Sequence, residues 1–144
     1  MSAPVPSHSR PPNILLVDDS EIDVLNMRRA LASGASVSQL WVAGDGLEAL
    51  AMLRGDEVPA ERRLVLLDLN MPRMNGLELL HVLRADPVLR RTAVVMLTSS
   101  DDPRDVAAAY QLNVAGYLVK PTTFEASVEL MSALVRYWGQ GEMP

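Results

Sequence analysis

The stretch Leu64-Val65-Leu66-Leu67-Asp68 is an apolar run that ends on a carboxylate. A short continuous apolar run is typical of a strand that is buried on both faces of a parallel sheet. In such a sheet the carboxyl ends of the strands lie along one edge. Three other apolar runs also end on reactive polar residues: Asp18 and Asp19 after residues 14–17, Thr98 after residues 93–97, and Lys120 after residues 116–119. The sequence therefore predicts that these side chains converge on Asp68.

Short apolar runs alternate with helix-period segments along the chain, which predicts an α/β fold with helices on both faces of a parallel sheet. The expected strands are residues 14–17, 37–42, 64–67, 93–97 and 116–119. The expected helices are residues 21–32, 46–53, 76–85, 104–112 and 123–138. These elements predict one doubly wound domain over residues 13–138, with no residues for a second domain. We expect a flexible N-terminal tail at residues 1–12 and a C-terminal tail at residues 139–144.

Composition narrows the class of protein. The chain has 144 residues, of which 49% are hydrophobic and 22% charged, as in a globular domain. Its net charge of −5 argues against nucleic acid or an anionic membrane as a partner. The absence of cysteine excludes disulfides and thiolate metal sites. Because no apolar stretch is long enough for a signal sequence or a membrane span, we expect a soluble, cytoplasmic protein.

The three carboxylates Asp18, Asp19 and Asp68 predict a Mg²⁺ site. Held within a few ångströms they would repel one another, and a hard divalent cation with oxygen ligands relieves that repulsion. Lys120 would add a positive charge beside phosphoryl oxygens, and Thr98 would offer a hydroxyl donor. Asp68 is then the nucleophile that attacks phosphorus.

Each of these residues also has a purely structural interpretation. An aspartate at a strand end often caps the following helix, and Asp18-Asp19 precede Ser20 and an expected helix. A threonine that ends a strand and a lysine before a proline are common. Their joint occurrence at four strand ends, in this order, favours the chemical interpretation.

Four ordered motifs resemble the receiver domain of two-component response regulators. They are Ile-Leu-Leu-Val-Asp-Asp-Ser at 14–20, Leu-Leu-Asp-Leu-Asn-Met-Pro-Arg-Met-Asn-Gly at 66–76, Val-Met-Leu-Thr at 95–98 and Gly-Tyr-Leu-Val-Lys-Pro at 116–121. The resemblance covers residues 13–138. It implies a flavodoxin-like receiver fold of five helices around a five-stranded parallel sheet in the order 2-1-3-4-5.

The resemblance also implies a role for each matching residue. Asp68 would accept the phosphoryl group. Asp19 and Asp68 would bind Mg²⁺ directly, Asp18 would act through water, and the backbone carbonyl of Asn70 would complete the metal site. Asn70 and Ser100 would tune the lifetime of the phosphoryl group.

Further implied roles belong to the switch and to the lysine. Thr98 and Tyr117 would form the switch pair, in which the hydroxyl follows the phosphoryl group and the ring follows the hydroxyl. Lys120 would pair with the phosphoryl group, and the bond from Lys120 to Pro121 is commonly cis in the family. Phosphorylation adds a charge of roughly −1.5 to −2 and would shift a pre-existing equilibrium toward a different surface.

The implied partners are other proteins. The donor would be the phosphohistidine of a sensor histidine kinase or a phosphotransfer protein, and an unidentified target would bind the changed surface. The regulator would catalyse its own phosphorylation and dephosphorylation rather than turn over a substrate. The connection at 54–63, Ser99-Ser-Asp101 and Tyr137-Trp-Gly139 resemble stand-alone regulators of bacterial phytochromes, which implies a light-sensing kinase. A phosphorelay intermediate is the alternative donor.

The last expected helix carries more apolar surface than one sheet face needs. One stripe contains Phe124, Val128, Met131 and Val135, which suffices to pack the helix on the sheet. A second stripe predicts a homodimer through the fourth helix, fifth strand and fifth helix, with its face at Leu130, Ala133 and Tyr137. The alternative is that the second stripe only closes the edge of the core.

Three other classes of protein share parts of this pattern. A phosphatase of the haloacid dehalogenase type needs a general acid two residues after its nucleophile, and Asn70 cannot donate a proton. A flavodoxin-like FMN carrier needs clustered hydroxyls after the first strand, where this chain has Asp18-Asp19. A receiver-like binding module that works without phosphorylation stays open.

Overall fold

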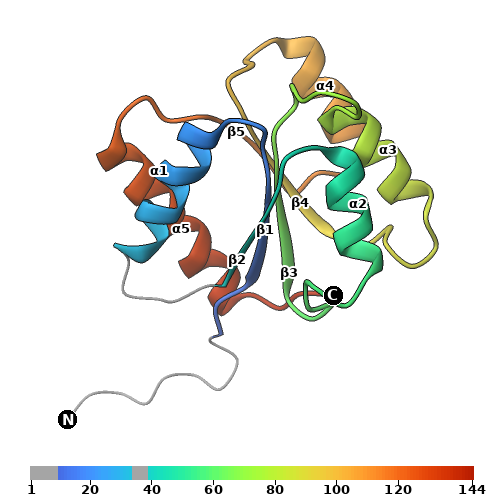
Figure 1. The fold of residues 1–144 in the computed structure, drawn as a ribbon, viewed down its shortest axis with the longest axis horizontal. Helices are drawn as coiled ribbons and strands as arrows, with labels where there is room; N and C mark the ends of the chain where they lie inside the picture. Colours follow the sequence, from blue (N-terminus) through green and yellow to red (C-terminus); the bar gives the residue numbers. More distant parts are fainter. Residues whose placement is uncertain (1–9, 34–38) are drawn as a thin grey trace.

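The computed structural model describes residues 10–33 and 39–144, in which five strands alternate with five helices (Figure 1). The strands are β1 (Asn13–Val17), β2 (Leu40–Ala43), β3 (Arg63–Leu67), β4 (Ala93–Thr98) and β5 (Gly116–Val119). The helices are α1 (Glu21–Ala32), α2 (Gly46–Arg54), α3 (Gly76–Ala85), α4 (Pro103–Gln111) and α5 (Phe124–Gln140). Every predicted element is present. The first residues of the expected strand 37–42, and most of the expected N-terminal tail, lie outside the described residues.

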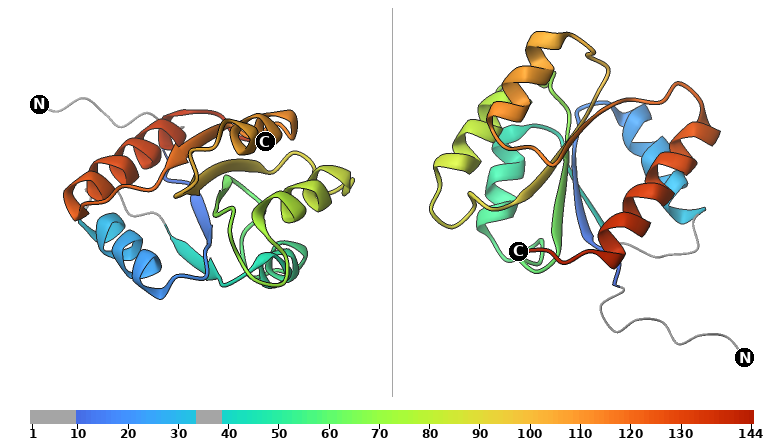
Figure 2. Two further views of the ribbon diagram at one scale, coloured as in Figure 1. Left: turned by 90° about the horizontal axis from the view of Figure 1, so that it is seen from above. Right: turned by 180° about the vertical axis from the view of Figure 1, so that it is seen from behind.

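The five strands form one parallel sheet in the order β2-β1-β3-β4-β5, which confirms the predicted topology. Helices α1 and α5 cover one face, and α2, α3 and α4 cover the other (Figures 1 and 2). Because β1 lies between β2 and β3, the chain reverses its winding direction after β2. The carboxyl ends of β1 and β3 therefore lie next to each other at the switch point of the sheet.

Strand β3 shows why the apolar run decides the fold. All five of its residues are buried. Leu64 and Leu66 pack with α1 and α5 on one face, and Val65 and Leu67 pack with α2 and α3 on the other. A strand in the middle of a doubly covered sheet needs apolar side chains on both faces, and the continuous run supplies them.

Each helix begins at a polar cap that the sequence places just after a strand or loop. The caps are Ser20, Asp45, Asn75, Asp102 and Thr123, and each side chain accepts a hydrogen bond from a backbone N–H in the first turn. Such bonds satisfy amides that have no partner inside the helix. At α3 the cap is reciprocal, because the Glu78 carboxylate also accepts from the Asn75 amide. Ser20, rather than Asp18 or Asp19, therefore caps α1.

Helix α5 differs from the prediction at both ends. It runs to Gln140, two residues beyond the expected end, because hydrogen bonds from Arg10 and Arg62 stabilise its last turn. The Arg10 amide donates to the Gly139 carbonyl at 2.8 Å. The Arg62 guanidinium donates to the carbonyls of Arg10, Trp138 and Gly141, which stabilises a helix C-terminus.

The predicted packing stripe on α5 was wrong at Phe124, which is 43% exposed, and it omitted Leu134, which is buried. Phe124 is the first residue of the helix and lies beyond the edge of the core. The three remaining stripe residues, Val128, Met131 and Val135, pack against the core formed with α1. Among the residues that the structure describes, no helix combines the length and apolar character needed to span a bilayer.

Candidate functional site

The site is built where adjacent strands end. Val17 and Leu67 are register partners in β1 and β3, and the Asp68 amide donates to the Val17 carbonyl at 2.9 Å. The residues that follow, Asp18 and Asp68, therefore leave the sheet side by side. On the other side of β3, Thr98 ends β4 and Lys120 follows β5, and the Lys120 amide donates to the Thr98 carbonyl at 2.9 Å.

Three carboxylates meet at this edge. Asp18, Asp19 and Asp68 each offer one oxygen, and these oxygens lie within 4.8 Å of one another. Asp18 and Asp68 are buried, whereas Asp19 is exposed, so the cluster has one open side. Burial raises the pKa of Asp18 above its usual value, although hydrogen bonds from Lys120 and the Ser20 amide act in the opposite direction. An all-oxygen acidic cluster with an open side fits a hard divalent cation.

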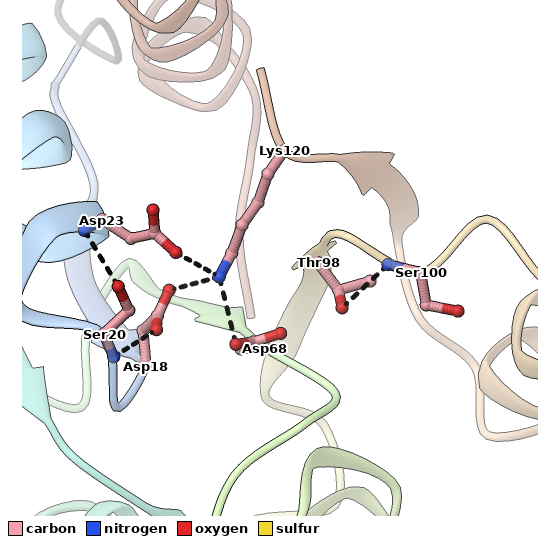
Figure 3. Close-up of polar contacts among 7 residues, drawn as sticks. All are labelled: Asp18, Ser20, Asp23, Asp68, Thr98, Ser100 and Lys120. Atoms are coloured by element: carbon pink, nitrogen blue, oxygen red, sulfur yellow. Dashed lines mark hydrogen bonds and ion pairs between the residues drawn. The ribbon is translucent and has the colours of Figure 1, made fainter. Parts of the chain in front are cut away.

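Lys120 lies across this acidic cluster (Figure 3). Its ammonium contacts carboxylate oxygens of Asp23 at 2.7 Å, Asp18 at 2.8 Å and Asp68 at 3.1 Å. Burial alone would lower the pKa of Lys120, but the hydrogen bonds and charges of these carboxylates outweigh burial and raise it. The lysine is therefore fully charged in the folded protein at neutral pH.

Thr98, Ser100 and Tyr117 connect the site to α4. Thr98 is fully buried, and its hydroxyl oxygen accepts a hydrogen bond of 3.4 Å from the Ser100 amide. The Tyr117 hydroxyl donates to the Ser100 carbonyl at 2.8 Å, and the Ser100 hydroxyl donates to the Asp105 carboxylate at 2.6 Å. A movement of Thr98 would therefore be transmitted to the first turn of α4 and to the tyrosine.

The loop after Asp68 is confined between α2 and α3. Asn70 is exposed, and the Gly76 amide already returns to the Leu69 carbonyl at 2.9 Å. Arg73, at a φ of 64°, pairs with the Asp45 carboxylate that caps α2. These contacts hold the segment that follows the central aspartate.

The chain matches the response regulator receiver domain family over residues 14–132. It belongs to the response regulator receiver family. The receiver is 36% identical over 134 residues to the response regulator Rcp1 of Synechocystis sp., a match that covers 90% of this chain and 91% of Rcp1.

Solved structures agree with the sequence match. The receiver superposes on the phosphorylated cyanobacterial phytochrome response regulator RcpA with a TM-score of 0.82 and 32% identity, covering 92% of this chain and 98% of RcpA. The Mn²⁺-bound form of Rcp1 gives a TM-score of 0.79 and 34% identity, covering 93% of this chain and 99% of that structure. The predicted family and flavodoxin-like fold are thus confirmed.

The structure brings most of the predicted site residues of the receiver together. Asp18, Asp68 and Lys120 are in direct contact, and Asp19 completes the acidic cluster. Thr98 and Tyr117 both contact Ser100 rather than each other by hydrogen bonds. The peptide bond from Lys120 to Pro121 is trans, so the cis bond implied by the resemblance is not observed.

Sequence reasoning missed two residues of the receiver site. Asp23 contacts Lys120 at 2.7 Å, and Gly76 lies against the backbone of Asp68. The signal for Asp23 was its place one turn after Asp19 in a helix that begins at the site. The signal for Gly76 was a glycine at the first position of a helix, where small size admits a close approach.

Proposed function

We propose that the receiver accepts a phosphoryl group on Asp68 from a phosphohistidine. The observation that carries this proposal is the burial of Asp68 where the strand ends meet, with the Lys120 ammonium 3.1 Å from its carboxylate. One Asp68 oxygen forms a bond to phosphorus while the phosphorus–nitrogen bond to the donor imidazole breaks. The bonding electrons leave with the imidazole nitrogen, which takes up a proton.

Mg²⁺ is the cofactor that suits the acidic cluster. Asp19, Asp68 and the Asn70 backbone carbonyl would hold the ion, with Asp18 acting through water. When bound, the ion neutralises charge on the carboxylates and on the phosphoryl oxygens. The relative Rcp1 is known in a Mn²⁺-bound form, which supports a divalent cation as a ligand of this chain as well.

Lys120 and Thr98 are the chain's own donors to the phosphoryl oxygens. Lys120 reaches Asp68 directly, and Thr98 is buried at the end of the neighbouring strand. A phosphoryl group adds roughly −1.5 to −2 charges, and it would draw both donors toward it. Since the Ser100 amide donates to Thr98 and its carbonyl accepts from Tyr117, the change would reach the surface of α4 and β5.

Asn70 and Ser100 are the positions at which we expect the phosphoryl lifetime to be set. Asn70 is exposed two residues after Asp68, where a side chain can shield or admit water. The Ser100 hydroxyl is already engaged by Asp105 at 2.6 Å, which keeps it oriented toward α4. Substitutions at these two positions should change hydrolysis more than phosphorylation.

The donor is proposed to be a sensor histidine kinase of the phytochrome class, with a phosphorelay intermediate as the alternative. The support is similarity to Rcp1 and RcpA over nine-tenths of the chain or more. Ile22 is 72% exposed and Leu25 is 47% exposed on the first two turns of α1, and Leu25 lines a pocket together with Asp18 and Asp19. This apolar pair is the surface on which we expect a donor helix to pack.

The variant Ile22→Ser tests the docking of the donor protein separately from the phosphorylation reaction at Asp68. The variant should take a phosphoryl group from acetyl phosphate at the wild-type rate, because the side chain is solvent-exposed and does not belong to the acidic cluster. Transfer from the kinase should fall about tenfold, the loss of one buried aliphatic side chain at an interface. Equal transfer from both donors would show that α1 is not the docking surface.

A homodimer through α4, β5 and α5 is proposed as the assembly. Exposed apolar residues occur on all three elements, including Tyr110, Val119 and Tyr137, of which Tyr137 is 69% exposed. Of the predicted face, Ala133 and Tyr137 are exposed, whereas Leu130 is partly buried against the core. Analytical ultracentrifugation should show a dimer that Tyr137→Ser weakens, and monomer alone with and without phosphoryl mimic would contradict it.

Intact-mass spectrometry after incubation with acetyl phosphate and Mg²⁺ tests the central proposal. The wild type should gain one phosphoryl group, and Asp68→Asn should gain none. Asp86→Asn is the matched control, because it removes an aspartate remote from the site and should be phosphorylated normally. A folded wild type that gains no mass would favour a receiver that binds its target without phosphorylation.

A further inference from the structure

We propose that Asp23 is a positioning residue that anchors the Lys120 ammonium for the phosphoryl reaction, a role that rests on the function proposed above. Asp23 lies in the first turn of α1, and Lys120 follows β5, so their contact joins elements 97 residues apart in sequence (Figure 3). At 2.7 Å it is the shortest of the three ion pairs of Lys120.

The donors of the ammonium are fully used in the structure. An ammonium has three N–H groups, and Lys120 has three carboxylate partners in Asp18, Asp23 and Asp68. A phosphoryl oxygen can therefore be bound only if one of these partners gives up its hydrogen bond.

Within the described part of the chain, the Asp23 side chain makes no hydrogen bond or ion pair other than that to Lys120. Asp18 and Asp68 belong to the acidic cluster and would turn toward a cation or the phosphoryl group, whereas Asp23 is not a member of that cluster. Its side chain is 36% exposed, compared with 2% for Asp18 and 8% for Asp68. Asp23 can thus keep its hydrogen bond while Lys120 exchanges the other two.

The backbone fixes Asp23 where this role requires it. The Asp23 amide donates to the Ser20 hydroxyl that caps α1, and the Ser20 amide donates to the Asp18 carboxylate. The helix cap therefore sets the distance between the anchor and the acidic cluster. An acid in the first turn also favours the helix by its charge alone, so the test must separate the two effects.

Glu21 provides the matched control. It is an exposed acid in the same first turn of α1 and makes no ion pair with Lys120 among the described residues. Glu21→Gln and Asp23→Asn each remove one negative charge from the same helix end. Only Asp23→Asn removes a charged carboxylate from Lys120, and Asp23→Glu restores one.

Lys120 is the only lysine of the chain, so ¹⁵N-labelled lysine reports on this ammonium alone. In metal-free wild type we expect an ammonium signal that persists because carboxylates shield its protons from exchange with water. The signal should be lost in Asp23→Asn, because the N–H that no longer faces a carboxylate exchanges with water even while Asp18 and Asp68 hold the other two. It should be retained in Glu21→Gln and recovered in Asp23→Glu. Thermal melting of each variant shows that it is folded.

Two further measurements connect the anchor to function. Without Asp23 the lysine stays on Asp18 and Asp68 and competes with a cation, so the Mg²⁺ dissociation constant by calorimetry should rise about fivefold, against less than about twofold for Glu21→Gln. Phosphorylation by acetyl phosphate at saturating Mg²⁺ should slow about tenfold.

The outcomes distinguish this inference from the function on which it rests. If Asp23→Asn matches Glu21→Gln in ammonium signal and Mg²⁺ affinity, the anchoring role is overturned even where the wild type is phosphorylated. If Asp23→Asn loses the signal but is phosphorylated at the wild-type rate, the anchor does not serve the reaction. If the wild type shows a held ammonium and takes no phosphoryl group, the proposed function fails and the placement of Lys120 by Asp23 stands.

Discussion

Gly76→Ala is expected to disturb Asp68, the proposed phosphoacceptor, because α3 begins against the backbone of that residue. A Cβ at position 76 would lie 3.0 Å from the Leu69 Cα, 3.1 Å from the Asp68 carbonyl carbon and closer still to the Asp68 carbonyl oxygen. Ordinary contacts with a Cβ begin at 3.4 Å. Since these neighbours are backbone atoms, no rotamer change relieves the crowding. Because the Asp68 carbonyl oxygen is the closest of them, either α3 or Asp68 must move by clearly more than about 0.4 Å.

Two opposing effects set the size of the stability loss. Alanine is favoured over glycine inside a helix by up to about 1 kcal/mol. Overpacking a well-packed site costs roughly 1–3 kcal/mol, so the net loss should be about 1.5 kcal/mol. For a domain of this length that loss lowers the melting temperature by roughly 6 °C. A displacement of a few tenths of an ångström at the nucleophile should also slow phosphorylation by about tenfold.

Gly116→Ala is the control, because a Cβ there would meet only the Val95 Cγ1 at an ordinary 3.9 Å. The thermal melting of both variants is followed by circular dichroism. Their phosphorylation by acetyl phosphate and Mg²⁺ is followed by intact-mass spectrometry. The reasoning is refuted if Gly76→Ala melts with the wild type and gains its phosphoryl group at the same rate.

Two further predictions concern residues that fasten loops. The Arg84 guanidinium donates to four backbone carbonyls, those of Leu112, Asn113, Arg90 and Thr92. Arg84→Met should therefore lower the free energy of unfolding, measured in urea, by about 2 kcal/mol. An effect no larger than that of Arg54→Met, a substitution of an exposed arginine, would contradict this prediction. Two hydrogen bonds lower the pKa of Asp45: the larger effect comes from the Glu48 amide and the smaller from the Arg73 guanidinium. The ionised Asp45 carboxylate therefore stabilises the fold fully above pH 3.8, and this stabilisation is lost as the pH falls through the lowered pKa. Asp45→Asn should therefore cost about 1 kcal/mol at pH 6 and progressively less as the pH falls below 3.8. A difference that does not shrink as the pH falls would show that the charge of Asp45 is not responsible.

The strand ends could be predicted from sequence because a buried strand requires a recognisable pattern of apolar residues. A strand covered on both faces must be apolar throughout, so the strand at Leu64–Leu67 and its end at Asp68 can be identified from the sequence alone. Parallel topology then places Asp68 beside Asp18 whatever the lengths of the connections. The same argument predicted Thr98, which ends the adjacent strand β4, and Lys120, which follows β5 and contacts Asp68 at 3.1 Å.

Contacts that cross between layers could not be predicted in this way. Asp23 is a half-exposed acid in a helix, and nothing in the helical period shows that its carboxylate faces Lys120 rather than solvent. The contacts of Arg62 could not be predicted either, because its guanidinium, just before β3, donates to the carbonyls of Trp138 and Gly141 at the far end of the chain. The end of α5 was misplaced for that reason, since the residues that hold it belong to a distant loop and to the N-terminal segment.

Helix α4 is held differently at its two ends, and this asymmetry suits a signal that starts at Thr98. At its C-terminal end, Arg84 binds the carbonyls of Leu112 and Asn113, and Asn113 has the left-handed backbone that ends the helix. At its N-terminal end the helix is linked to the site through Ser100, whose amide, carbonyl and hydroxyl bind Thr98, Tyr117 and Asp105. A displacement of Thr98 would therefore act on the N-terminal end of α4, while the Arg84 guanidinium holds the opposite end.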